Sequence, residues 1–212
     1  MDEQLRRATE VLKQFTVCQL IDAVGGSCAV ETAITPVDAL HRICGVALTV
    51  ECIPGDNLTL HHALHLAEPG DVLIVGGSAN CEVALWGELM SVSAKSRGIA
   101  ATIIDGPIRD PVEIRAMGYP VFSRSFHPCR AKKESYGRIN VPIQMGALSI
   151  KPRDIVLADA NGIVSISPGR VQEIIQLTSE VAQKENQIKT QILSGRTMFD
   201  IFALDRYVTR GS

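Results

Sequence analysis

The sequence has 212 residues, of which 46% are hydrophobic and 21% are charged, and its formal net charge is −2 at pH 7. This composition suits one folded domain with a sizeable core. The charge balance gives no electrostatic case for binding nucleic acid or an anionic membrane surface, and no apolar run approaches the roughly 20 residues of a membrane span. The N-terminus lacks the apolar region of a secretory signal, so we expect a cytoplasmic protein with reduced cysteines.

The chain is predicted to begin with a helical segment, residues 1–25. Its first helix is amphipathic and carries four apolar residues on one face, Leu5, Ala8, Leu12 and Phe15. The helical pattern continues from Thr16 until Gly25 and Gly26 stop it. The next residues, 27–44, show little periodicity and are expected to be irregular.

From residue 45 to residue 122, short apolar strands alternate with helices. Strands are predicted at 46–53, 72–75, 100–104 and 120–122, and helices follow the first three strands, ending near residues 67, 96 and 117. Asp56 or Asn57 can cap the first of these helices. The alternation predicts an α/β fold with a central parallel sheet and right-handed crossovers. Strands that are almost entirely apolar indicate a sheet covered on both faces.

The second half of the chain is predicted to be β-rich over residues 123–167 and helical over 168–212. One strand is expected around Asn140 to Ile143, and an Asn-Gly turn joins a hairpin of strands 154–158 and 162–166. Ser167 and Pro168 are a cap and first residue for a long helix that Gly195 ends. The apolar tail, 197–207, is expected to dock on the core or on a neighbouring subunit. No linker divides the chain, so we predict a single domain over 1–212.

The histidines and cysteines give little indication of a metal site. His61 and His65 share a helix face at i, i+4 but lack the glutamate of a zincin motif, so packing or surface roles are favoured. The six cysteines form no C-x-x-C pair, which favours small buried hydrophobic residues over zinc ligands.

The stretch 103–111 allows two interpretations. It passes from an apolar run through an Asp-Gly-Pro turn to the adjacent Arg109 and Asp110, where a helix begins. Asp110 and Glu113 match an N-cap and a capping box, and these residues alone favour that structural role. However, the carboxyl ends of parallel strands are also where ligands usually bind. There, an arginine beside an aspartate could hold an anionic substrate and a metal ion together.

A second loop supports the functional interpretation. Strand 72–75 ends in Gly76 and Gly77, and the next helix begins near Gly87 with amides that have no partner inside the helix. If the two strands are neighbours, the amides of 87–90 and Arg109 could bind one carboxylate. Asp110 could then hold Mg²⁺ or Mn²⁺, which prefer oxygen ligands and keep their waters. The alternative for this loop is a glycine-rich turn that serves packing alone, and its spacing matches no nucleotide-binding motif.

Several motifs occur together, in the order in which a known family carries them. They are GDVLIV at 70–75, WGELM at 86–90, RGIA at 97–100, IDGPIRD at 104–110, VPI at 141–143 and DANGIV at 159–164. Over about residues 16–176 the chain resembles the RraA-like family, which includes metal-dependent 4-hydroxy-4-methyl-2-oxoglutarate (4-carboxy-4-hydroxy-2-oxoadipate) aldolases. The resemblance implies a swivelling β/β/α fold assembled as trimers or hexamers, with the active site at a subunit interface.

The resemblance also implies roles for particular residues. The pyruvate carboxylate would be bound through the backbone of Gly87, Glu88, Leu89 and Met90. Arg109 would contact the substrate, Asp110 would hold the metal, and the two would form the catalytic pair. The aldolases also use acidic residues of a neighbouring subunit, whose positions in this chain the resemblance leaves open. The segment 123–136 departs from the family's small-residue pattern, which leaves the choice of substrate open.

Two functions therefore follow as hypotheses. The first is a class II pyruvate aldolase that depends on Mg²⁺ or Mn²⁺, cleaves a small 4-hydroxy-2-oxo acid and also decarboxylates oxaloacetate. The second is a non-catalytic regulator, because similar RraA proteins bind ribonuclease E. Those regulators lack the Arg-Asp pair that this chain has, which favours the enzyme. A methyltransferase is not favoured, because the chain has no glycine-rich cofactor loop.

Overall fold

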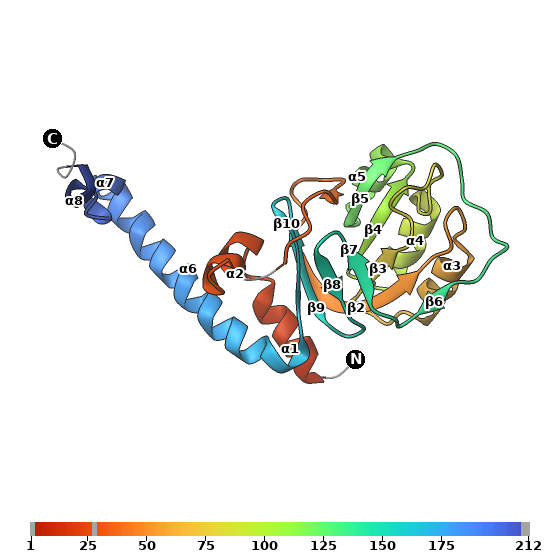
Figure 1. Cartoon of the computed structure of the whole chain (residues 1–212), viewed down its shortest axis with the longest axis horizontal. Helices are drawn as coiled ribbons and strands as arrows, with labels where there is room; N and C mark the ends of the chain where they lie inside the picture. The colour runs from red at the N-terminus through yellow and green to blue at the C-terminus, as the bar shows by residue number, and fades with distance from the viewer. Residues whose placement is uncertain (1–2, 27–28, 209–212) are drawn as a thin grey trace.

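An eight-stranded mixed sheet organises the chain (Figure 1), in the order β1-β5-β4-β3-β2-β9-β10, with β6 also pairing with β2. The structure, a computed structural model, describes residues 3–26 and 29–208. The strands are β1 Thr35–Pro36, β2 Ile43–Glu51, β3 Asp71–Gly76, β4 Ala101–Ile108, β5 Val121–Phe126, β6 Arg138–Ile139, β7 Ile143–Met145, β8 Leu148–Ile150, β9 Ile155–Asp159 and β10 Gly162–Ile166. The helices are α1 Glu3–Leu12, α2 Val17–Ala23, α3 Leu58–Leu66, α4 Glu88–Ser96, α5 Pro111–Met117, α6 Val171–Leu193, α7 Met198–Ile201 and α8 Asp205–Val208.

The predicted α/β fold is confirmed. Strands β2, β3, β4 and β5 are parallel neighbours, and α3, α4 and α5 connect them. Every residue of β4 is buried, as expected of a strand covered on both faces. The predicted hairpin β9–β10 then adds to the edge of β2 in antiparallel orientation, so the β-rich second half extends the same sheet. The small β7–β8 hairpin was not predicted.

The Asp-Gly-Pro turn predicted at residues 105–107 is wrong, because β4 continues to Ile108. The strand is held on both sides beyond the predicted turn. The Leu85 amide donates to the Pro107 carbonyl at 3.1 Å, and the His127 amide donates to the Ile108 carbonyl at 2.9 Å. Proline lacks an amide hydrogen, and the pairing with β5 shifts register between Ile104 and Pro107. Longer-range pairing therefore overrides the local turn signal.

Three other local predictions also need correction. The strand expected at 140–143 is divided, because Asn140 has a left-handed φ of 57° and separates β6 from β7. Thr16 begins a new helix with a capping box instead of continuing the first one. In the described part of the chain, Ser167 makes no side-chain cap, and a 3₁₀ turn, Pro168–Arg170, precedes α6.

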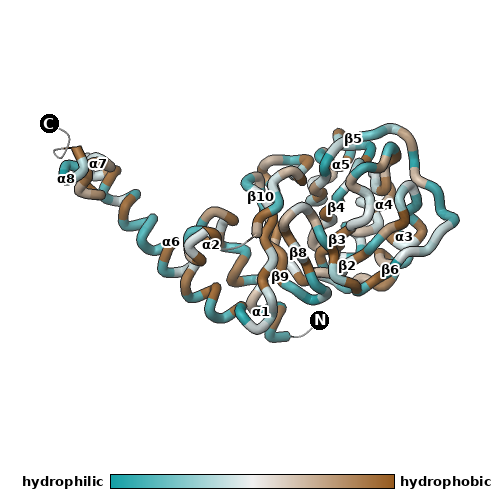
Figure 2. The backbone as a smooth tube through the Cα atoms, in the orientation of Figure 1, coloured by the Kyte–Doolittle hydropathy of each residue, from teal (hydrophilic) through white to brown (hydrophobic). Residues whose placement is uncertain are grey.

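The C-terminal helix α6 extends away from the sheet, with α7 and α8 at its far end (Figures 1 and 2). Phe199, Phe202 and Tyr207 are 43%, 41% and 68% exposed. Docking of the tail on the core of the same chain is therefore wrong, and docking on a neighbouring subunit stays a prediction. Among the described residues, no helix combines the length and apolar character needed to cross a bilayer.

The described cysteines are all free thiols, in agreement with the absence of a C-x-x-C pair. Cys44 and Cys52 are buried, and burial raises the pKa of each thiol to about 12, which makes both unreactive. Cys18 and Cys129 are exposed, so the expectation of burial is wrong for these two. Cys28 lies outside the described residues.

Candidate functional site

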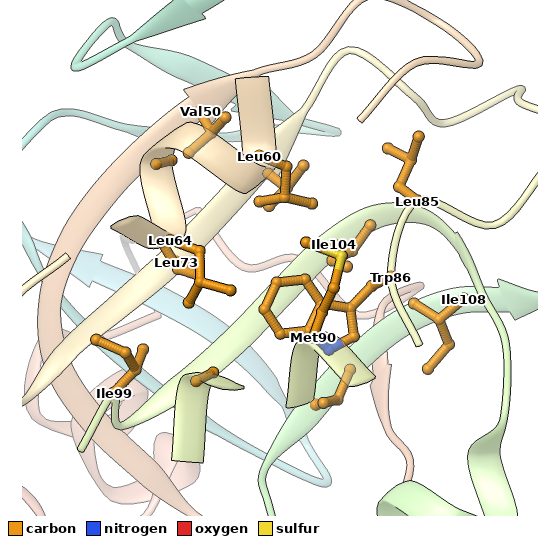
Figure 3. Close-up of a cluster of buried hydrophobic side chains, with 14 of the residues drawn as sticks. Val50, Leu60, Leu64, Leu73, Leu85, Trp86, Met90, Ile99, Ile104 and Ile108 are labelled. Atoms are coloured by element: carbon orange, nitrogen blue, oxygen red, sulfur yellow. The ribbon is translucent and has the colours of Figure 1, made fainter. Parts of the chain in front are cut away.

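A short extended segment, residues 84–86, brings the two predicted loops together. Trp86 pairs with Ile108 at the end of β4, and the Arg109 amide donates to the Trp86 carbonyl at 3.0 Å. The Trp86 side chain is buried in the hydrophobic cluster beneath, beside Ile104 and Met90 (Figure 3). This packing positions the first turn of α4 beside Arg109. The loops that follow β3 and β4 can meet there because the two strands are neighbours in the sheet.

The carboxylate of Asp110 does not cap its own helix, so the capping prediction is wrong within the described structure. Asp110 adopts a left-handed backbone with φ 58°, ψ 45°, a conformation that aspartate tolerates better than most residues. Its Oδ2 instead accepts a hydrogen bond from the Glu88 amide of α4 at 3.1 Å. Asp110 therefore joins the two loops and sits at the positive end of a neighbouring helix.

Arg109 holds the same carboxylate. Its Nε lies 3.1 Å from both Oδ1 and Oδ2 of Asp110. The Asp110 side chain is 27% exposed and that of Arg109 is 42% exposed, so both groups remain accessible to a ligand. The sequence placed this cation and anion side by side, but it did not indicate that they pair with one another.

Gly87 allows this close approach. A Cβ atom at this position would lie 2.7 Å from Cγ of Arg109 and 2.8 Å from Oδ2 of Asp110. Its φ of −165° is extended backbone that any residue adopts. The glycine is therefore needed for space and not for backbone conformation.

The predicted site residues all line one cavity of about 490 Å³, a size typical of small-molecule sites. Its walls are Asn57, His61, Ala84, Leu85, Trp86, Gly87, Glu88, Leu89, Met90, Arg109, Asp110, Arg130, Ala131 and Lys133. The Glu88 amide is engaged by Asp110, whereas the amides of Leu89 and Met90 belong to the first helical turn and have no partner inside the helix.

Four polar residues of this cavity were not identified from the sequence: Asn57, His61, Arg130 and Lys133. Asn57 is 6% exposed and donates from Nδ2 to the Leu85 carbonyl at 2.8 Å, while its Oδ1 has no partner among the described residues. Burial, with a smaller contribution from the charge of Lys133, lowers the pKa of His61. The basic run in 130–133 was a usable signal, but no local pattern connects it to Arg109.

Asp56 anchors the segment that carries Arg130 and Lys133. Its Oδ2 accepts hydrogen bonds from the Glu134 and Ser135 amides at 2.7 and 2.8 Å, and its Oδ1 accepts one from Leu58 at 2.9 Å. Of the two candidate caps, Asn57 occupies the N-cap position of α3 without a side-chain cap bond, and Asp56, one residue earlier, accepts from the first helical amide, that of Leu58. Desolvation opposes ionisation of this carboxyl, but the three amide hydrogen bonds outweigh it and hold the pKa below its ordinary value.

Replacing Asp56 with Asn is expected to loosen this segment. Hydrogen exchange at the Glu134 and Ser135 amides should become faster, because a neutral amide oxygen is a weaker acceptor than a carboxylate. In the wild-type protein this anchoring is present above the unfolded pKa of about 3.9 and is lost as the pH falls through the lower folded value. Asp38→Asn is the matched control, since Asp38 is half-buried and its Oδ1 accepts from the amide of Leu40, two residues away. Unchanged exchange in Asp56→Asn contradicts the anchoring role.

The oxygen donors at this site suit a hard cation that keeps most of its water ligands. They do not suit a cation that is bound mainly by protein side chains. Among the described residues, no group of three or more His, Cys, Asp or Glu could hold a metal ion. The cavity does offer carboxylates from Asp110 and Glu88. Carboxylate oxygens completed by water are the usual environment of Mg²⁺ and Mn²⁺.

Comparison with known proteins matches the chain to a family model, to relatives and to solved structures of similar fold. A family model described as "RraA-like: Aldolase/RraA" matches residues 16–165. A relative from Halalkalibacterium halodurans, named as a proposed 4-hydroxy-4-methyl-2-oxoglutarate aldolase, is 32% identical over 183 residues, covering 86% of each chain. A crystal structure of an uncharacterised protein from Pseudomonas syringae superposes with a TM-score of 0.82 at 26% identity, covering 91% of each chain. Streptomyces coelicolor RraAS2, described as an unusual member of the RNase ES inhibitor RraA family, has a TM-score of 0.79 at 23% identity, covering 89% of this chain and 97% of that one.

Proposed function

We propose that this chain, which belongs to the RraA-like family, is a divalent-metal-dependent carbon–carbon lyase. It cleaves a 4-hydroxy-2-oxo acid of the 4-hydroxy-4-methyl-2-oxoglutarate type into pyruvate and a second oxo acid. The observation that carries the proposal is the joining of α4 to the Arg109–Asp110 pair in one cavity. The name of the Halalkalibacterium relative supports the same reaction.

The 2-oxo acid end of the substrate binds between the first turn of α4 and Arg109. The amides of Leu89 and Met90 donate to its carboxylate, as amides at a helix N-terminus commonly do for anions. The Arg109 guanidinium adds charge-assisted hydrogen bonds to the same end of the substrate. The resemblance implied that the Glu88 amide also binds the substrate carboxylate. In the structure this amide donates to Asp110 instead, and it keeps that carboxylate in place.

Asp110, with Glu88 nearby, would hold the divalent cation, which supplies Lewis-acid polarisation of the 2-oxo group. A water beside Arg109 accepts the proton of the C4 hydroxyl, and the C3–C4 bond then breaks. Its electron pair moves into the 2-oxo group to give the enolate of pyruvate, while C4 becomes a carbonyl. The Arg109 guanidinium stabilises the developing negative charge in a partly enclosed site.

The same enolate forms when oxaloacetate loses carbon dioxide, so we propose decarboxylation as a side activity of the same residues. We also propose assembly as a homotrimer or hexamer, which would give the exposed apolar tail a surface on which to dock. A neighbouring subunit could then add acidic groups to the cavity.

Removal of the metal is the test of this function. Purified protein with Mg²⁺ or Mn²⁺ should release pyruvate from 4-hydroxy-4-methyl-2-oxoglutarate, and a chelator should abolish that release. Adding back the cation in excess of the chelator should restore it, which separates metal dependence from damage to the protein. Full turnover in the presence of the chelator contradicts the proposal, as does the absence of pyruvate from a panel of 2-oxo acids.

The second candidate function is a non-catalytic regulator that binds a ribonuclease. The fold shared with RraAS2 and the exposed apolar residues of the C-terminal extension favour it. A stoichiometric complex with a ribonuclease, together with no turnover of any 2-oxo acid, would replace the lyase with this function.

A further inference from the structure

One wall of the cavity carries two cations that the proposed reaction has not used. The segment 129–131 pairs with Ala84, whose amide donates to the Cys129 carbonyl at 2.7 Å, while the Ala131 amide donates to the Ala84 carbonyl at 3.1 Å. Residues 84–86 therefore lie between this segment and the end of β4. Arg130 and Arg109 both line the cavity, on backbone segments that residues 84–86 separate.

These two cations, Arg130 and Lys133, have no hydrogen-bond or ion-pair partner among the described residues. Their neighbour Lys132 differs, because it lies 3.8 Å from Glu134 and is not part of the cavity wall. The acidic groups that line the cavity are Glu88 and Asp110, and Asp110 is already paired with Arg109. The wall formed by Arg130 and Lys133 therefore has positive charge available for an anionic ligand.

The wall is also rigidly attached. Asp56 binds the backbone immediately after Lys133, and the Asn57 amide donates to the Lys132 carbonyl at 3.0 Å. Side chains on an anchored backbone lose less freedom when a ligand binds than side chains on a free loop. A ligand in the cavity thus meets two fixed points, Arg109 beside α4 and the wall formed by Arg130 and Lys133.

We infer that Arg130 and Lys133 bind a second carboxylate of the substrate, remote from its 2-oxo acid end. The cavity then selects dicarboxylic 4-hydroxy-2-oxo acids over monocarboxylic ones. This inference rests on the proposed function for the identity of the reacting end. It adds the residues that determine specificity, in the segment where the sequence departs from the family pattern.

The kinetic test compares a dicarboxylic with a monocarboxylic substrate, 4-hydroxy-4-methyl-2-oxoglutarate and 4-hydroxy-2-oxopentanoate. Arg130→Ala and Lys133→Ala should each lower kcat/KM for the dicarboxylate by about tenfold, the effect expected for loss of one hydrogen bond to a charged group. The change should fall mainly on KM. The monocarboxylate should change less than about twofold. Lys132→Ala is the matched control and should leave both substrates unchanged. Equal losses on both substrates, or no loss on either, overturn the inference.

A binding measurement separates this inference from the proposed function. Calorimetry with 2-oxoglutarate and 2-oxobutyrate, in buffer that contains Mg²⁺, should show tighter binding of the dicarboxylate to the wild-type protein. The double variant Arg130→Ala/Lys133→Ala should lose that preference. If wild-type protein shows the preference without turnover, the lyase proposal fails and the inference holds. If the preference is absent, or persists in the double variant, the inference fails whatever the turnover.

Discussion

Pyruvate release is expected to fall by about 10³-fold or more when Asp110 is replaced by Asn. The substitution removes the negative charge that would hold the cation and that pairs with Arg109, yet it keeps the backbone conformation and the acceptor for the Glu88 amide. Asn tolerates the left-handed backbone of this position, with its φ of 58°, and its side-chain oxygen can still accept from the Glu88 amide. The variant therefore tests the charge of Asp110 and not the fold around it.

Glu113→Gln is the control for this experiment. Glu113 lies in the first turn of α5, is exposed and does not line the cavity, so its substitution should leave the rate unchanged. The melting temperature of Asp110→Asn should stay within about 2 °C of wild type, less than the shift that a 1 kcal/mol loss of stability produces. Turnover at the wild-type rate in Asp110→Asn would rule out Asp110 as the metal-binding group.

Replacing Gly87 with Ala is expected to lower the rate by at least about 10²-fold, the effect that a 1 Å displacement of catalytic groups can have. The new Cβ would lie 2.7 Å from the Arg109 side chain and 2.8 Å from the Asp110 carboxylate, so both must move. The backbone itself accepts alanine, since φ is −165°. Activity should therefore fall more than stability.

Gly169→Ala is the matched control for Gly87→Ala. A Cβ atom added at Gly169 would meet nothing within 4 Å, and the residue has no left-handed φ, so alanine there should leave rate and melting temperature near wild-type values. A Gly87→Ala variant with kcat/KM within about twofold of wild type would show that the Arg109–Asp110 geometry is not needed for turnover.

The parallel core was predictable because its signals are local. Apolar runs such as Val72–Val75 indicate buried strands, and glycine or proline residues mark their ends. The sequence also predicted that the loops after β3 and β4 meet at one sheet edge, since consecutive parallel strands are usually neighbours. The structure pairs β3 with β4 and brings Trp86 to Ile108.

The turn expected at 105–107 and the cap expected at Asp110 were both wrong for one reason. Each was inferred from a pattern that is reliable only when no distant segment competes for the same groups. Residues 84–86 pair with the end of β4 and extend it through the proline. The Glu88 amide takes the oxygen of Asp110 that was expected to cap α5.

The sequence by itself determined the fold class, the buried strands and the candidate ligand-binding residues at two strand ends, because periodicity and turn chemistry act between near neighbours. Only the tertiary structure decided how those residues pair and what faces them across the cavity. Asp110 binds an amide 22 positions away, and Asp56 anchors the cationic wall 78 positions away. Contacts at such separations depend on how the strands assemble and not on any local pattern, so the presence of Arg130 and Lys133 in the same cavity as Arg109 emerges only in the folded chain.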